Sequence, residues 1–323
     1  MGAGFNYEKQ SIYSRSFLAA VCQTSRSQTI TETFGTGTNQ FSIEFVQVGD
    51  VGNPNGGLAG RGAVGYSYNI GKYEISREMV LKANSDAGIG ITLQDLTVYG
   101  GNGGKRPASG INWFEAARFV NYLNLTSGNP LAYKFDSNGN FQLWSASDAG
   151  FDPANGYRNK LAKYFVPSKD EWYKAAYYDP SKTNGRYWKF ANRTDSKPIA
   201  VGDGTNQGTA VYDGQAGPAD IDNSGGLSYY GTMAQDGNVY EWLETSFHSY
   251  DNNWPGDPHH ILSGSWVKYA EIGGLGAGFW DGRWPQEEPA DYGFRVAMVP
   301  EPSALSLLAV GLGVVLRRRR RTG

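Results

Sequence analysis

Cysteine and histidine are scarce in this chain of 323 residues. The single cysteine, Cys22, excludes an intrachain disulfide, a cysteine-rich zinc site and a redox centre that uses paired thiols. The three histidines, His248, His259 and His260, leave few nitrogen ligands for a metal centre rich in histidine. We therefore expect no catalytic metal site built from these two residue types.

The chain also lacks a large charge of either sign. Its net charge is -2, and the only dense basic run, Arg317 to Arg321, lies at the extreme C-terminus. No basic face is available for a nucleic-acid backbone, so we expect no nucleic-acid binding. The sequence does contain 40% hydrophobic and 14% aromatic residues, enough for a buried core, and 44 glycines without a fixed period. These glycines predict many turns and long loops.

Three different segments follow one another at the C-terminus. Pro300-Glu301-Pro302 precedes the apolar run Ala304 to Leu316, and the basic cluster closes the chain. The cluster consists of Arg317, Arg318, Arg319, Arg320 and Arg321. The apolar run is shorter than the roughly 20 residues of a straight transmembrane helix, so it is predicted to insert only marginally. The arginines would keep that end in the cytoplasm, with the preceding domain outside.

This order of segments resembles the bacterial PEP-CTERM sorting signal, in which the Pro-Glu-Pro motif, an apolar stretch and an arginine cluster are recognised by an exosortase. The resemblance implies an exported protein of the cell envelope or extracellular space, held in the membrane by its C-terminal segment before processing. An ordinary C-terminal membrane anchor is the alternative, and it also implies export.

The chain divides into three predicted regions. Residues 1–39 are expected to be a degenerate leader, since only the six apolar residues Phe17 to Cys22 follow Arg15, fewer than a signal peptide needs. Residues 40–298 are expected to form one domain, and residues 299–323 the sorting tail. How export begins stays open.

Within the domain, a few regular elements are predicted between long loops. Strands are expected near Phe41 to Phe45, Tyr66 to Ile75, Ile261 to Val267 and Gly293 to Met298. Helices are expected after three capping residues, Ser76, Asn112 and Ser168; the last two have a glutamate three residues on, as in a capping box. The pattern favours a mixed α+β domain with short strands.

Six phrases then occur in a characteristic order. They are Gly71-Lys72-Tyr73-Glu74-Ile75-Ser76, Ile111-Asn112-Trp113-Phe114-Glu115-Ala116, Val166-Pro167-Ser168-Lys169-Asp170-Glu171-Trp172, Gly237-Asn238-Val239-Tyr240-Glu241-Trp242, Ser263-Gly264-Ser265-Trp266 and Gly293-Phe294-Arg295-Val296-Ala297. Together they resemble the sulfatase-modifying factor family, also called the formylglycine-generating enzyme domain. The resemblance implies a variant of the C-type lectin fold, rich in loops. Trp172, Trp242 and Trp266 are expected in the core.

Active members of that family hold copper with two cysteines shortly after the Gly-Ser-Trp phrase and oxidise a sulfatase cysteine to formylglycine. In this chain the corresponding positions fall at about Lys268 and Gly273, neither of which offers the soft sulfur ligand that Cu(I) selects. Copper and the oxidation are therefore not expected. The resemblance also implies a structural Ca²⁺, held by the carbonyls of Gly237 and Val239 and the carboxylate of Glu241. A further Asn ligand of the family falls on Ala234, so a Glu241 that only accepts backbone hydrogen bonds is the alternative.

These observations favour a non-catalytic module that binds a polysaccharide or a protein outside the cell. The predicted binding residues lie on a glycine-rich loop, where aromatic side chains can stack on a ligand: Tyr269, Phe279, Trp280, Arg283 and Trp284. A small loop core made of the same residues is the alternative. Two other functions stay open: a formylglycine-generating or related oxidoreductase with another centre, and a structural envelope protein that assembles with copies of itself.

Overall fold

A computed structural model describes Met1 and residues 29–56, 60–184, 186–247, 259–262, 264–267, 274–279 and 281–299. The predicted sorting residues Pro300, Glu301, Pro302 and Arg317 to Arg321 lie outside these ranges, as do Tyr269 and Trp280. None of the helices in the described ranges is long and apolar enough to cross a membrane. The transmembrane segment predicted in the tail falls beyond the last described residue.

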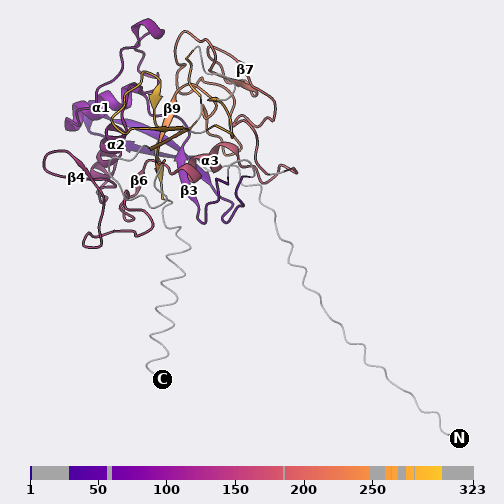
Figure 1. The fold of residues 1–323 in the computed structure, drawn as a ribbon, viewed down its shortest axis with the longest axis horizontal. Helices are drawn as coiled ribbons and strands as arrows, with labels where there is room; N and C mark the ends of the chain where they lie inside the picture. Colours follow the sequence, from indigo (N-terminus) through magenta and orange to yellow (C-terminus); the bar gives the residue numbers. More distant parts are fainter. Residues whose placement is uncertain are drawn as a thin grey trace.

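The described chain forms a mixed α+β fold with few helices (Figure 1). The helices are α1 (Arg77–Ala87), α2 (Trp113–Thr126) and α3 (Lys169–Tyr177), with short 3-10 turns η1 (Gly37–Asn39) and η2 (Thr97–Tyr99). The longer strands are β1 (Thr29–Phe34), β2 (Phe41–Val48), β3 (Tyr68–Gly71), β9 (Tyr240–Ser246) and β10 (His259–Leu262). The shorter ones are β4 (Lys134–Phe135), β5 (Phe141–Gln142), β6 (Tyr164–Phe165), β7 (Ile199–Ala200), β8 (Thr209–Ala210), β11 (Asp281–Arg283), β12 (Tyr292–Gly293) and β13 (Ala297–Met298).

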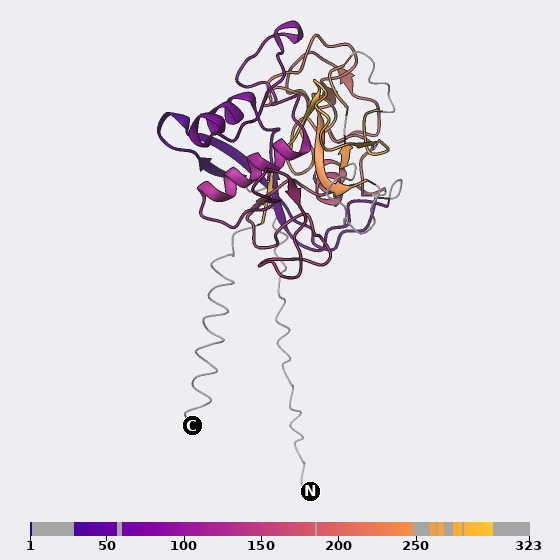
Figure 2. The same cartoon turned by 60° about the vertical axis from the view of Figure 1, so that its left-hand side comes forward.

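Two sheets carry the architecture. One has five strands in the order β1-β2-β3-β13-β6, and the other has four in the order β11-β10-β9-β12. Helices α1 and α2 lie side by side over the strands of the five-stranded sheet (Figure 2). Between β12 and β13 the chain crosses from one sheet to the other, so the predicted strand Gly293 to Met298 is divided into two short ones. The crossing places Arg295 between the sheets.

The capping predictions are confirmed. Ser76 accepts a hydrogen bond from the Met79 amide at the start of α1. Asn112 and Ser168 form capping boxes with the glutamates three residues on, and each helix begins at the next residue. These side chains satisfy amides that have no partner within the helix. The sequence therefore predicted where all three helices begin.

The N-terminal boundary of the folded region differs from the prediction. Strand β1 (Thr29–Phe34), which falls in the segment expected to be a leader, pairs with β2 along its whole length. Its threonines alternate in exposure with the residues between them, as in an edge strand with one covered side. The folded region thus includes residues 29–39 as well as the predicted domain.

The core is aromatic. The indoles of Trp113, Trp172 and Trp242 are fully buried and Trp266 is 2% exposed, which confirms the three tryptophans predicted as core residues. The Trp113 indole donates to the carbonyl of Leu243 at 3.0 Å. Because each buried indole N–H needs an acceptor, such bonds fix the helices against β9.

Candidate functional site

Strand β9 carries two glutamates, Glu241 and Glu244, that are buried on opposite faces of the strand. Their exposed fractions are 0% and 2%. Residues three apart in a strand point to opposite sides, so each carboxylate meets a different part of the molecule. Glu241 faces Arg295, and Glu244 faces Arg158. The two pairs define two regions, which we call the Glu241 centre and the Arg158 pocket.

The Glu241 centre is a fully satisfied ion pair. Arg295 donates to Glu241 through Nε and Nη2, both at 2.6 Å, and the Trp172 indole donates to Oε2 at 2.7 Å. The remaining donors of the Arg295 guanidinium reach the carbonyls of Gly71 at 3.0 Å and Met233 at 2.8 Å. Both charged side chains are 0% exposed. The centre therefore links the two sheets and leaves no group of Arg295 directed at solvent.

Glu74 lies beside this centre and is also buried. Its carboxyl accepts from the Asn238 amide at 2.6 Å and from the backbone N–H of Val239 at 3.3 Å. Burial raises the pKa of Glu74 well above its ordinary value, and the Glu241 carboxylate raises it further. A proton on Glu74 relieves the repulsion between two carboxylates that share a single arginine.

The predicted calcium ligands Gly237, Val239 and Glu241 lie at the start of β9 and just before it. The Glu241 carboxylate is already bonded to Arg295 and Trp172, and Val239 bonds Glu74 through its N–H. Among the described residues, no group of three or more His, Cys, Asp or Glu side chains could hold a metal ion. Calcium here stays a prediction, but these contacts favour the alternative in which Glu241 only accepts hydrogen bonds.

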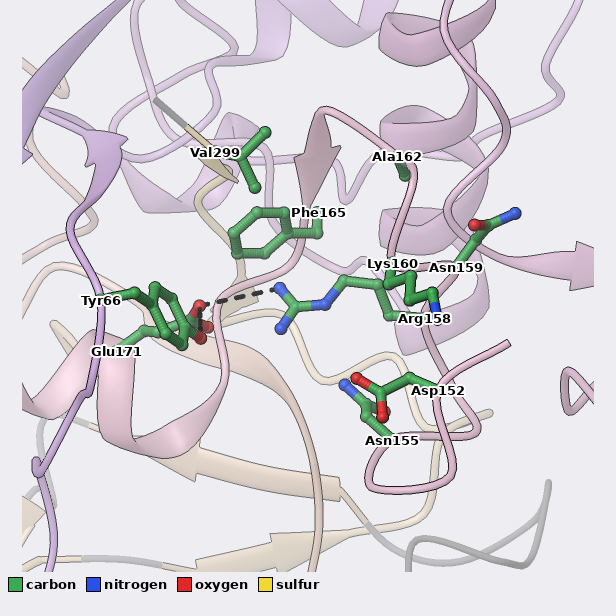
Figure 3. A pocket seen from close by; sticks show the side chains of 10 residues that line it. All are labelled: Tyr66, Asp152, Asn155, Arg158, Asn159, Lys160, Ala162, Phe165, Glu171 and Val299. Carbon is green, nitrogen blue, oxygen red and sulfur yellow. Dashed lines mark hydrogen bonds and ion pairs between the residues drawn. The ribbon is translucent and has the colours of Figure 1, made fainter. Parts of the chain in front are cut away.

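The Arg158 pocket is a cavity of about 280 Å³ on the other side of β9 (Figure 3). It is lined by Tyr66, Asp152, Asn155, Arg158, Asn159, Lys160, Ala162, Phe165, Glu171 and Val299. The guanidinium of Arg158 extends across the pocket toward Tyr66 and Glu171 (Figure 3). Val299, the last residue that the structure describes, is part of this lining.

Arg158 is held more loosely than Arg295. Its Nε lies 3.4 Å from Glu244 and its Nη1 lies 3.7 Å from Glu171, while the guanidinium covers the ring of Phe165 at 3.8 Å. The Nη1 nitrogen is buried and has no hydrogen-bond partner in the described part of the chain. Burial alone would lower the pKa of Arg158, but the Glu244 and Glu171 carboxylates raise it above its ordinary value. The arginine is thus charged, and a donor remains unused.

The two carboxylates around Arg158 have other partners. The Tyr66 hydroxyl donates to Glu171 at 2.7 Å, and the Ser168 amide donates to its second oxygen at 2.6 Å. Glu244 accepts from the Tyr133 hydroxyl at 2.7 Å and from Asn155 at 2.5 Å. Burial raises the pKa of Glu244, and Arg158 opposes that rise. Glu171 therefore serves both as the capping residue of α3 and as a wall of the pocket.

The described residues of the predicted binding loop have different surroundings: Phe279 and Arg283 contact other residues of the domain, whereas Trp284 is exposed. Phe279 packs on Tyr240 with ring centroids 5.6 Å apart, and Arg283 donates to the Tyr292 hydroxyl at 2.6 Å. Trp284 is 51% exposed. Of the described members of the predicted set, Trp284 is therefore the aromatic side chain most available to a ligand. The pairing of Phe279 with Tyr240 agrees with the alternative of a small loop core.

Sequence reasoning missed the Arg158 pocket. Its members come from the segment before β3, from the loop before β6 and β6 itself, from α3 and from the residue after β13, and no local pattern connects them. The Asp152 side chain accepts from the Ala154 amide at 2.9 Å, an Asx turn that the sequence Asp-Pro-Ala-Asn could have suggested. That turn predicts a loop and carries no indication of a pocket.

The fold defines the class of protein: a loop-rich α+β domain of the C-type-lectin-like kind that formylglycine-generating enzymes use. Residues 63–299 match the model of the sulfatase-modifying factor enzyme 1-like domain, and the chain belongs to that family. Residues 299–321 match the PEP-CTERM protein-sorting motif. The chain is thus marked for exosortase-mediated sorting to the cell envelope. Both family predictions are confirmed.

Solved structures support the same fold. Treponema denticola variable protein 1 is 19% identical, with a TM-score of 0.57, over 84% of this chain and 99% of that one. CarF is 19% identical, with a TM-score of 0.55, over 80% and 99%. PvdO from Pseudomonas aeruginosa is 14% identical, with a TM-score of 0.52, over 83% and 98%. No match to a curated protein was found.

Proposed function

We propose that this exported envelope protein uses its sulfatase-modifying-factor-like domain to bind a polysaccharide or a protein outside the cell, and that the domain does not carry out the family's oxidation. The observation that carries the proposal is the position of the only thiol. Cys22 precedes the matched domain, so residues 63–299 contain no cysteine. A copper centre that depends on two thiolates has no ligands there.

The geometry around the family's phrases supports a structural role for their charged residues. Glu241, Trp172 and Arg295, which belong to three different phrases, bond one another in the Glu241 centre. Groups that are buried and fully paired stabilise the fold, and they are not free to abstract or donate a proton at a substrate. The unused donor of Arg158 and the exposed ring of Trp284 are the features that favour binding.

The test is a paired assay on the purified full chain. Metal content is measured by mass spectrometry after exposure to copper, and the same sample is incubated with a cysteine peptide from a sulfatase under oxygen. It is then screened on a glycan array and against envelope proteins. We expect no stoichiometric copper, no oxidised peptide and reproducible binding to at least one glycan or protein. Bound copper with peptide oxidation would establish the oxidoreductase alternative. The absence of both peptide oxidation and ligand binding would favour the self-assembling alternative.

A further inference from the structure

The Arg158 pocket contains a buried donor that no acceptor in the described part of the chain uses. This donor is Arg158 Nη1, and leaving it unpaired costs about 1–3 kcal/mol. Arg77 Nε is another such donor, but of the two only Arg158 lines the cavity. In the Glu241 centre the same residue type has acceptors for Nε, Nη1 and Nη2. The unused donor in the pocket therefore favours an acceptor that arrives with a ligand.

The polar lining restricts the charge of that ligand. The wall carries two cations, Arg158 and Lys160, and two carboxylates, Asp152 and Glu171, with Glu244 behind Arg158. A simple anion meets the carboxylates, and a simple cation meets Arg158 and Lys160, so neither gains a net attraction. A hydroxyl group both donates and accepts hydrogen bonds, so a ligand with several hydroxyls can pair with both the donors and the acceptors of this lining.

The size and the remaining wall restrict the shape. A volume of about 280 Å³ lies just below the range of small-molecule pockets, roughly 300–1,000 Å³, and suits one ring-sized group. Phe165, Ala162 and Val299 form an apolar side above Arg158 (Figure 3). Tyr66 stands at the opposite edge and is 48% exposed. A sugar ring has apolar C–H faces and polar edges, which is the combination that such a wall accommodates.

We propose that the Arg158 pocket binds one neutral hexose unit of a polysaccharide, with ring hydroxyls bonded to Arg158, Asp152 and Lys160 and the ring against Tyr66. The proposal rests on the extracellular binding function above and names a second site for it, away from the predicted loop with Trp284.

Calorimetric titration of the full chain with trisaccharides of glucose, mannose and galactose tests the proposal, with trigalacturonate and a glucosamine trisaccharide as charged probes. We expect at least one neutral trisaccharide to bind more tightly than both charged probes. Tyr66→Ala should weaken that binding about tenfold, since a loss of ~1.4 kcal/mol corresponds to tenfold in affinity. Asp152→Asn should weaken it about fivefold and retain the Asx turn.

Leu81→Ala is the control, because Leu81 is an exposed apolar residue on α1, outside the pocket lining and outside the predicted binding loop. It should leave the dissociation constant within about twofold. Because the Tyr66 hydroxyl also bonds Glu171, thermal unfolding checks that each variant is folded. If Tyr66→Ala does not fold, Asp152→Asn still tests the pocket. Tighter binding of a charged probe, or no effect of either pocket variant, overturns the proposal.

Two outcomes separate this proposal from the broader function. If the wild-type chain binds a glycan and only Trp284→Ala abolishes binding, the binding function stands and the pocket proposal is wrong. If the chain binds an envelope protein but no neutral trisaccharide, the pocket proposal is likewise wrong. If it binds no glycan and no protein, both are wrong.

Discussion

The Glu241 centre and the Arg158 pocket use the same residue types on opposite faces of β9, with opposite results. In the centre, two N–H groups of Arg295 meet one carboxylate at 2.6 Å and two more meet backbone carbonyls. In the pocket, the guanidinium lies 3.4 and 3.7 Å from two carboxylates. Helix α3 contributes to both regions, through Trp172 to the centre and through Glu171 to the pocket.

The difference shows how a binding site can be recognised without a catalytic motif. A buried charge whose partners are all internal stabilises one arrangement of the chain, whereas a charge with an unused donor beside a cavity can meet a ligand. Glu241 and Arg295, which belong to phrases that identify the family, are of the first kind. The pocket draws most of its charged and amide groups from the loop before β6.

The largest expected effect is the loss of Arg295. Arg295→Met leaves Glu241 buried without its cation, beside the carboxyl of Glu74, and we expect the free energy of unfolding to fall by about 3–5 kcal/mol. Urea denaturation measures the change. Arg118→Met, at a partly exposed arginine whose guanidinium lies 4.0 Å from Glu115, is the control and should change stability by less than about 0.5 kcal/mol. A fall below 1 kcal/mol for Arg295→Met would mean that the pair does not link the sheets.

Asp236 is a buried carboxyl whose pKa no arginine lowers, so it shows the effect of burial without an ion pair. Burial raises the pKa of Asp236 to about 7, and its side chain accepts from the Asn192 amide. Because the native state holds this proton more tightly than the unfolded chain, the contribution to stability falls as the pH rises from about 4 to 7, by ~1.4 kcal/mol per unit at most. Asp236→Asn should remove this dependence and raise stability at pH 7. Equal slopes for wild type and variant in urea unfolding at several pH values would contradict it.

The helix cap that borders the pocket gives a smaller effect. In Ser168→Ala the Glu171 amide loses its acceptor, and we expect a loss of about 1 kcal/mol in thermal or urea unfolding. Ser85→Ala, inside α1, is the matched control, since its hydroxyl only bonds the carbonyl of Leu81 on an exposed helix face. The control should cost less than about 0.5 kcal/mol. Similar losses for both variants would show that the capping box does not fix the start of α3.

The smallest expected effect concerns calcium. Since the Glu241 carboxylate already has three N–H donors, we expect the unfolding midpoint to be the same with a calcium chelator as with millimolar Ca²⁺. Differential scanning calorimetry on the chain in both conditions measures this. A higher midpoint in Ca²⁺ that Glu241→Gln abolishes would instead establish the ion at the predicted site.

The sequence predicted the fold family, the starts of the three helices and strand β2, because caps and apolar alternation are local signals. It did not predict β9, although the first residues of this strand belong to a phrase of the family. A strand with two buried glutamates does not alternate between apolar and polar residues, and their burial depends on arginines distant in the sequence. It missed β1 because a threonine-rich edge strand resembles a polar linker. The pocket depends on contacts between segments, and no local pattern contains them.

Arg295 and Arg158 pair with glutamates on opposite faces of β9. On this account Arg295 stabilises the fold, whereas Arg158 binds a ligand. The most direct test measures unfolding free energy and affinity for a neutral trisaccharide in Arg158→Met and Arg295→Met, side by side with wild type, at a temperature where all three are folded. We expect Arg158→Met to lose at least tenfold in affinity and Arg295→Met to keep its affinity within about threefold, while both variants lose stability because each leaves a buried carboxylate without its cation. Loss of affinity in Arg295→Met alone, with Arg158→Met binding as wild type does, would contradict the account.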